Sequence, residues 1–142
     1  MEPVLAAERV PSAVPSVRVL VVDDFEGWRR FVRTALRKQR EIEIVSEASD
    51  GPEAVLKATE LHPDLILLDI GLPTLDGIET ARQIRKISPT SRILFVSQES
   101  CADVVERALG TGAGGYVIKS HAAKELLPAI RSVLEGKPFY RE

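Results

Sequence analysis

The sequence predicts an α/β protein with a doubly wound, five-stranded parallel sheet in the order 2-1-3-4-5 and helices on both faces. Three observations predict this class: short apolar runs alternate with stretches of helical periodicity, the first run is rich in β-branched residues, and the run Leu65–Leu68 is apolar throughout. A continuously apolar strand must be covered on both faces, as a central strand of a parallel sheet is.

The first half of the chain is expected to form three strands and two helices. A strand at Val17–Val22 ends at two aspartates, and a helix over residues 26–39 follows, because apolar residues recur there at steps of three and four. The more alternating strand at Ile42–Ala48 is typical of a sheet edge. Asp50 can cap a second helix, which has a proline early in its first turn. The central strand then runs over residues 63–69.

The second half repeats this alternation. Three helices and two strands are expected, at residues 76–87 (helix), 92–97 (strand), 102–109 (helix), 116–119 (strand) and up to about 136 (helix). Pro128 within the last helix removes one backbone donor and should kink it, unless the helix starts late enough to place Pro128 near its first turn. Crossovers of this length are right-handed, which favours the flavodoxin-like strand order.

The two ends of the chain differ in kind from the rest. Residues 1–16 hold three prolines with little periodicity and are expected to form a flexible N-terminal extension. Residues 17–136 are expected to form one folded domain. Residues 137–142 are too short for an element and are interpreted as a C-terminal tail or the start of a linker.

Length and composition exclude several classes of protein. The 142 residues suit one core, and 44% hydrophobic with 28% charged residues is typical of soluble globular domains. Charges interrupt every apolar run long before the roughly 20 residues of a membrane span, and Cys101 has no partner for a disulfide. A net charge of -2 gives no general attraction to nucleic acids. We therefore expect a cytoplasmic domain that binds neither nucleic acid nor membrane.

The predicted topology gathers polar residues at one place. In an open parallel α/β sheet the carboxyl ends of the strands share one edge, where ligands bind. The first strand ends in Asp23 and Asp24, the third in Asp69, the fourth in Ser97 and the fifth in Lys119. Three neighbouring carboxylates either raise some of their pKa values or bind a cation, and oxygen ligands favour Mg²⁺, with Mn²⁺ as the alternative.

These groups fit phosphoryl transfer to a carboxylate. Asp69 is the expected acceptor, because it ends the most buried strand and begins a loop. Asp23 and Asp24 would hold the cation, and Lys119 and Ser97 would bind phosphoryl oxygens. The phosphoryl group adds roughly two negative charges, enough to draw these last two side chains inward and to change a surface.

Four stretches of sequence resemble the receiver (CheY-like) domain of response regulators in two-component signalling. They are residues 21–24 (Val-Val-Asp-Asp), 69–77 (Asp-Ile-Gly-Leu-Pro-Thr-Leu-Asp-Gly), 96–97 (Val-Ser) and 112–119 (Gly-Ala-Gly-Gly-Tyr-Val-Ile-Lys). The resemblance covers residues 17 to about 135. Gly-Leu-Pro at 71–73, Lys-Ser at 119–120 and residues 124–136 are most similar to receivers of NarL-like (LuxR-type) transcription factors.

The resemblance implies specific roles. Asp69 would take a phosphoryl group from the phosphohistidine of a sensor histidine kinase and become an aspartylphosphate. Mg²⁺ would be bound by Asp24, Asp69 and the carbonyl of Gly71, and by Asp23 mainly through water. Ser97 would be the switch hydroxyl, and Tyr116 the aromatic residue that turns inward with it. The receiver would catalyse its own phosphorylation and slow dephosphorylation without being an enzyme, and a homodimer is compatible with the resemblance.

In NarL-like regulators a linker and a DNA-binding domain follow the receiver. The six residues after Gly136 are too few for such a domain. The chain is either a stand-alone receiver or part of a longer regulator of transcription, and we expect the second, because residues 136–140 resemble the start of such a linker.

Two residues depart from the family pattern. Gln98 is bulky where many receivers carry a small residue, and we expect it to slow both phosphorylation and hydrolysis. Ser120 replaces the proline common after the lysine. It leaves open whether the preceding bond is cis, since a cis bond before a non-proline residue costs about 3 kcal/mol.

The same residues allow other interpretations. Any single aspartate could merely cap a helix, Lys119 could be a solvated surface lysine, and Tyr116 could be an ordinary strand aromatic. A flavodoxin-type electron carrier would share the fold, but two acids after the first strand would repel the FMN phosphate. An aspartyl phosphohydrolase would need a second carboxylate two residues after Asp69 as general acid, and position 71 is glycine. A degenerate receiver would lack an acid or the lysine.

Overall fold

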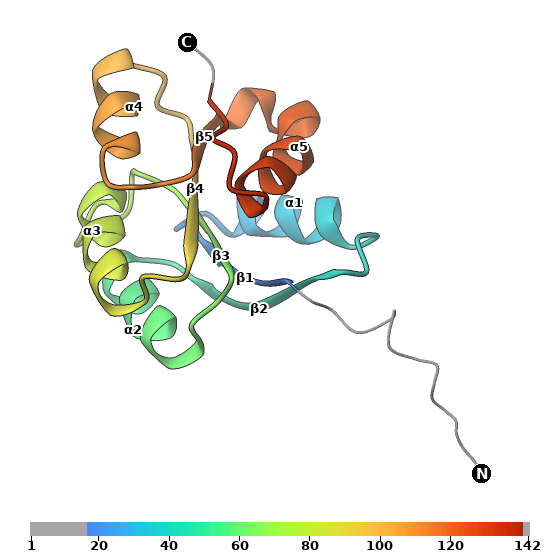
Figure 1. The fold of residues 1–142 in the computed structure, drawn as a ribbon, viewed down its shortest axis with the longest axis horizontal. Coiled ribbons are helices and arrows are strands. Elements are labelled where there is room, and N and C mark those ends of the chain that lie inside the picture. The colour runs from blue at the N-terminus through green and yellow to red at the C-terminus, as the bar shows by residue number, and fades with distance from the viewer. Residues whose placement is uncertain (1–16, 141–142) are drawn as a thin grey trace.

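The computed structural model describes residues 17–140, which form a five-stranded parallel sheet in the order β2-β1-β3-β4-β5 (Figure 1). The strands are β1 (Val17–Val22), β2 (Ile42–Ala48), β3 (Leu65–Leu68), β4 (Arg92–Ser97) and β5 (Gly115–Ile118). The helices are α1 (Glu26–Leu36), α2 (Gly51–Leu61), α3 (Gly77–Ile87), α4 (Ala102–Leu109) and α5 (Ala122–Leu134). The predicted fold class and strand order are confirmed. None of these helices is long and apolar enough to cross a membrane.

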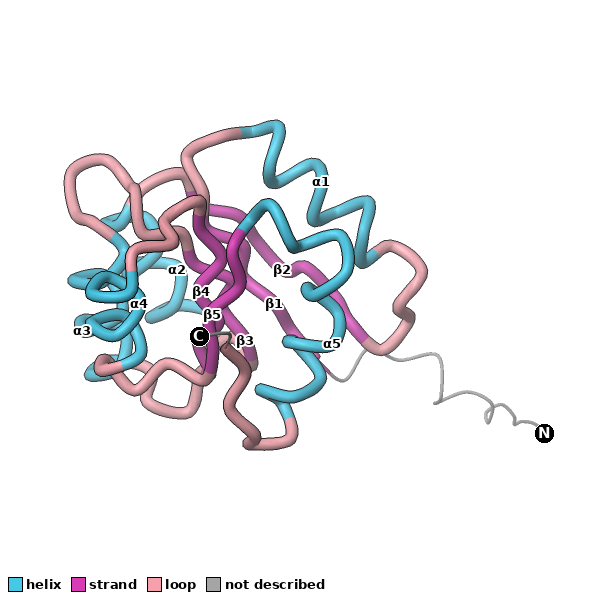
Figure 2. The backbone as a smooth tube through the Cα atoms, turned by 90° about the horizontal axis from the view of Figure 1, so that it is seen from above, coloured by secondary structure: helices cyan, strands magenta, loops and turns pink. Residues whose placement is uncertain are grey.

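The sheet is covered on both faces, as the apolar β3 predicted. Figures 1 and 2 show α1 and α5 on one side of the sheet and α2, α3 and α4 on the other. Within β3, Ile66 and Leu68 pack in the core under α2–α4, while Leu65 and Leu67 pack in the core under α1 and α5. Because successive side chains alternate between the faces, every residue of this central strand is buried.

Two helices begin at aspartate caps. The carboxylate of Asp50 accepts a hydrogen bond from the backbone N–H of Glu53 (2.8 Å) at the start of α2. The carboxylate of Asp76 does the same for Glu79 (2.9 Å) in α3. Each bond satisfies a donor that the helix itself leaves unpaired and contributes about 1 kcal/mol. The α3 cap matters for the site, because it sets where the loop after β3 ends.

Several predicted boundaries were wrong. The first helix ends at Leu36 instead of residue 39, and the last strand stops at Ile118, so Lys119 begins a short 3-10 turn that leads into α5. Pro128 lies well inside α5, so the alternative of a late helix start is wrong. The apolar face of α5, with Leu126 and Ile130 buried against the sheet, offsets the backbone donor that Pro128 lacks.

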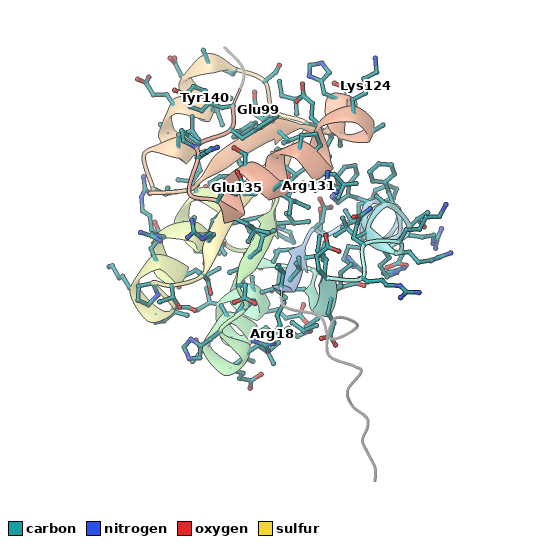
Figure 3. All side chains as sticks on the ribbon, turned by 45° about the vertical axis from the view of Figure 1, so that its right-hand side comes forward. Arg18, Glu99, Lys124, Arg131, Glu135 and Tyr140 are labelled. Carbon is teal, nitrogen blue, oxygen red and sulfur yellow. The ribbon has the colours of Figure 1, made fainter. Side chains whose placement is uncertain are left out.

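The segment after α5 pairs with the edge of the sheet, which the sequence did not indicate. The backbone N–H of Tyr116 donates to the carbonyl of Phe139 (2.7 Å), and the N–H of Phe139 donates to the carbonyl of Gly114 (3.1 Å). A Cβ on Gly115 would lie 2.5 Å from the Phe139 oxygen, so glycine permits this approach. Figure 3 shows Tyr140 near the β5 edge, far from Arg18 of β1. The predicted extension over residues 1–16 lies outside the described residues.

Candidate functional site

All five strand-end residues predicted for the site lie at the carboxyl edge of the sheet. Asp23 and Asp24 follow β1, Asp69 follows β3, Ser97 ends β4 and Lys119 follows β5. Together they line a pocket of about 330 Å³. The strands are parallel and adjacent in the order β1-β3-β4-β5, so four loops that are distant in sequence open onto the same place.

The three carboxylates form one cluster. Each offers an oxygen that lies within 4.8 Å of the other two, and Asp23 and Asp69 are buried while Asp24 is exposed. One oxygen of each buried acid is held by the backbone: Asp23 Oδ1 accepts from the N–H of Phe25 (2.9 Å), and Asp69 Oδ1 accepts from the N–H of Ile70 (2.7 Å). The second oxygen of each therefore remains for chemistry in the pocket.

Lys119 occupies the space between these second oxygens. Its Nζ lies 2.6 Å from Asp23 Oδ2 and 3.4 Å from Asp69 Oδ2. The ammonium also lies over the ring of Trp28, 5.0 Å from the ring centroid. The lysine side chain is 13% exposed, which places it inside the pocket and not on the solvated surface. The alternative of an ordinary surface lysine is wrong.

The charges of the cluster do not balance. Three carboxylates and one ammonium leave a formal charge of -2 in a partly buried pocket. Burial raises the pKa of Asp23, and the Lys119 ammonium and the N–H of Phe25 oppose that increase. Asp23 Oδ2 is buried and forms an ion pair with the Lys119 ammonium. A divalent cation that prefers oxygen ligands fits both the charge and the donors.

Ser97 and Tyr116 are connected through the loop after β4. The Ser97 Oγ is buried and accepts from the N–H of Glu99 (3.3 Å), while the Tyr116 hydroxyl donates to the carbonyl of Glu99 (2.7 Å). Tyr116 points inward and is 3% exposed, and its burial raises its pKa to about 12. The same short segment is therefore bonded to both predicted switch residues.

The remaining predicted positions lie at the rim of the pocket. Gly71 and Gln98 both line it and are exposed. The peptide bond between Lys119 and Ser120 is trans, because the described residues contain no cis bond. The loop from Asp69 to α3 is closed by a hydrogen bond from the N–H of Gly77 to the carbonyl of Ile70 (2.7 Å).

Three contributions to the site were missed at the sequence level. The N–H of Phe25 and the carbonyl of Glu99 are backbone groups, for which residue type carries no signal. Trp28 is the sole tryptophan and lies one helical turn after Asp24. That spacing places it near the first strand's end, but its contact with Lys119 depends on how α1 packs on the sheet.

Comparisons with known proteins identify the family of the chain. The family model of the response regulator receiver domain matches residues 19–131. The response regulator protein VraR of Staphylococcus aureus is 37% identical over 125 residues, which are 88% of this chain and 60% of VraR. The chain thus spans less than two thirds of the length of this curated relative.

Two solved structures add detail. A two-component response regulator of the LuxR family from Aurantimonas sp. SI85-9A1 has a TM-score of 0.83 and 33% identity, covering 87% of this chain and 89% of that one. The signal receiver domain of the response regulator NarL from Mycobacterium tuberculosis has a TM-score of 0.81 and 32% identity, covering 87% and 99%. On the fold, the family match and these likenesses, the chain belongs to the response regulator receiver domain family of two-component systems.

Proposed function

We propose that Asp69 accepts a phosphoryl group from the phosphohistidine of a sensor histidine kinase. The observation that carries the proposal is that the two oxygens of Asp69 have different partners. The N–H of Ile70 donates to Oδ1, and Oδ2 faces the pocket beside Lys119. In the transfer, a carboxylate oxygen bonds to phosphorus as the bond from phosphorus to the histidine nitrogen breaks. That nitrogen keeps the electron pair, and a proton on the other ring nitrogen makes the departing histidine side chain a neutral imidazole.

Asp23, Asp24 and Asp69 would hold the metal ion, together with the carbonyl of Gly71, and Asp23 would act mainly through water. Mg²⁺ suits these oxygen donors, with Mn²⁺ as the alternative. When bound, the ion neutralises charge on the acids and on the phosphoryl oxygens. Lys119 and the Ser97 hydroxyl bind the remaining phosphoryl oxygens, and the N–H of Phe25 keeps Asp23 oriented.

The chain acts on itself and turns over no separate substrate. The same groups that align Asp69 for phosphorylation also admit water for slow hydrolysis, so we class it as a phosphoacceptor switch and not as an enzyme. Phosphorylation places about two negative charges beside Ser97 and Lys119. The Glu99 segment, bonded to both Ser97 and Tyr116, would carry the change to the surface formed by α4 and β5.

We place residues 17–136 in the receiver and residues 137–142 at the start of a linker. The share of VraR that this chain covers supports a further domain in the complete regulator, and LuxR-type relatives support an output in transcription regulation through DNA binding. The chain carries a formal net charge of -2 and would bind no DNA directly. A homodimer of receivers is compatible with this output.

Incubation with a small phosphodonor such as acetyl phosphate tests the proposal. With Mg²⁺, intact-mass spectrometry should detect one added phosphoryl group on the wild type and none on Asp69→Asn. Asp50→Asn is the matched control, because asparagine also caps a helix and the same charge is removed from a residue that does not line the pocket. Trp28 fluorescence should respond to Mg²⁺ and then to beryllofluoride, with the second response absent in Asp69→Asn. No uptake and no beryllofluoride adduct by NMR would contradict the proposal.

A further inference from the structure

We propose that Trp28 is a positioning residue for Lys119, and that the face of its indole ring keeps the ammonium in place for phosphoryl transfer. The inference rests on the phosphoacceptor function proposed above. It starts from one contact: Lys119 Nζ lies over the Trp28 ring at 5.0 Å from the centroid, within the range of cation–π attraction.

The Lys119 ammonium has two kinds of neighbour, carboxylates and an indole ring. Two are carboxylates, Asp23 Oδ2 at 2.6 Å and Asp69 Oδ2 at 3.4 Å. Both belong to the cluster that would bind a divalent cation, so a bound cation would compete with the lysine for these oxygens and repel its charge. The indole face attracts the ammonium without using those oxygens. Among the ammonium contacts given for residues 17–140, it is the one that involves no carboxylate of the acidic cluster.

Trp28 is also held firmly enough to act as a support. The side chain is half-buried, packs against the core under α1 and α5, and stacks on Phe31 with ring centroids 4.9 Å apart. A ring fixed by packing has little freedom left to lose when it binds the ammonium. Tryptophan is also the aromatic residue with the strongest cation–π attraction. Packing alone would not require an aromatic face at this position, and this difference can be tested.

Trp28→Phe and Trp28→Met are a suitable pair of variants. Both side chains are smaller than tryptophan and similar to each other in size, but phenylalanine alone keeps an aromatic face. In Mg²⁺-free protein, NMR should find the ε-methylene protons of Lys119 shifted upfield by the ring current in the wild type, less so in Trp28→Phe and not in Trp28→Met. The shift in the wild type should persist when Mg²⁺ is added. This readout does not depend on phosphoryl transfer.

Phosphorylation by acetyl phosphate at saturating Mg²⁺ gives the second readout. Trp28→Met should be phosphorylated about fivefold more slowly than the wild type, the factor that about 1 kcal/mol of cation–π attraction gives. Trp28→Phe should recover most of that rate. Val133→Ala, a core truncation at the far end of α5, controls for a general loss of stability and should keep the wild-type rate.

The outcomes separate the two proposals. Equal rates for Trp28→Phe and Trp28→Met, or a Lys119 shift that is absent from the wild type or disappears with Mg²⁺, would overturn the positioning role. If the wild type takes up no phosphoryl group, the phosphoacceptor function fails and any part for Trp28 in it fails too. The NMR arm then still decides whether the indole holds Lys119.

Discussion

Gly77 controls how closely α3 approaches the residue proposed to be phosphorylated. It is the first residue of α3, and a Cβ built on it would lie 2.0 Å from the carbonyl oxygen of Asp69 and 2.6 Å from the Cα of Ile70. Its N–H donates to the carbonyl of Ile70 at 2.7 Å. Because both neighbours are backbone, no side chain can swing away to make room. Gly77→Ala must therefore displace either α3 or the loop that carries Asp69.

The structure sets the size of the expected effect. To reach an ordinary contact of about 3.4 Å, the added carbon and the carbonyl oxygen must separate by roughly 1.4 Å more. Overpacking of this kind costs about 1–3 kcal/mol, and the preference of a helix for alanine over glycine returns at most about 1 kcal/mol. We expect the free energy of unfolding to fall by about 2 kcal/mol and Tm by roughly 6 °C. Phosphorylation of Asp69 should slow as well.

Urea denaturation and thermal unfolding measure the change in stability, and acetyl phosphate labelling measures the change in rate. Gly110→Ala is the control, because Gly110 has helical φ and ψ and its Cβ would meet other atoms no closer than 3.4 Å. That variant should stay within about 0.5 kcal/mol of the wild type. If Gly77→Ala is equally stable and equally reactive, the argument from close approach is refuted.

Three further predictions concern the switch residues, the pocket rim and the tail. The pKa of Tyr116 is raised to about 12 in the folded state, so above pH 10 the unfolded chain ionises first and stability falls towards pH 12. Alkaline urea denaturation should show this loss, roughly 2 kcal/mol, in the wild type and not in Tyr116→Phe; equal losses would refute it. Gln98→Ala should speed both phosphorylation and dephosphorylation of Asp69 about threefold, since Gln98 lines the pocket, and unchanged rates would show that its amide does not obstruct approach. Phe139→Ala should cost about 1–2 kcal/mol and speed hydrogen exchange of the Tyr116 amide, unlike the exposed Tyr140→Ala; unaltered exchange would mean that the tail pairs without help from the ring.

The order and type of the elements could be predicted because each apolar pattern is local. The bounds of β1, β2 and β4 agree with the sequence, since strand residues must alternate or be covered on both faces wherever they lie. Element boundaries that depend on contacts between distant parts of the chain were harder to predict from the sequence. Pro128 stays inside α5 because that helix packs on the sheet, and Phe139 pairs with β5 because Gly115 leaves room for its carbonyl.

The sequence predicted which residues form the site, but not which of their atoms contact one another. Asp23, Asp69 and Lys119 meet because parallel strands end at one edge, and strand order is readable from the alternation of patterns. Which oxygen of each acid the backbone holds, and which side chains surround the ammonium, depends on rotamers and on the angle at which α1 packs. No one-dimensional pattern contains those quantities.

By itself, the sequence determined a parallel sheet whose strand ends carry three acids, a hydroxyl and a lysine, because hydrophobic burial and chain connectivity leave one sensible topology. Tertiary structure alone decided that the lysine lies between two buried carboxylates and an indole ring, and that the tail closes the β5 edge. The physical reason is range: periodicity acts over a few residues, whereas charge contacts and edge pairing join positions tens of residues apart.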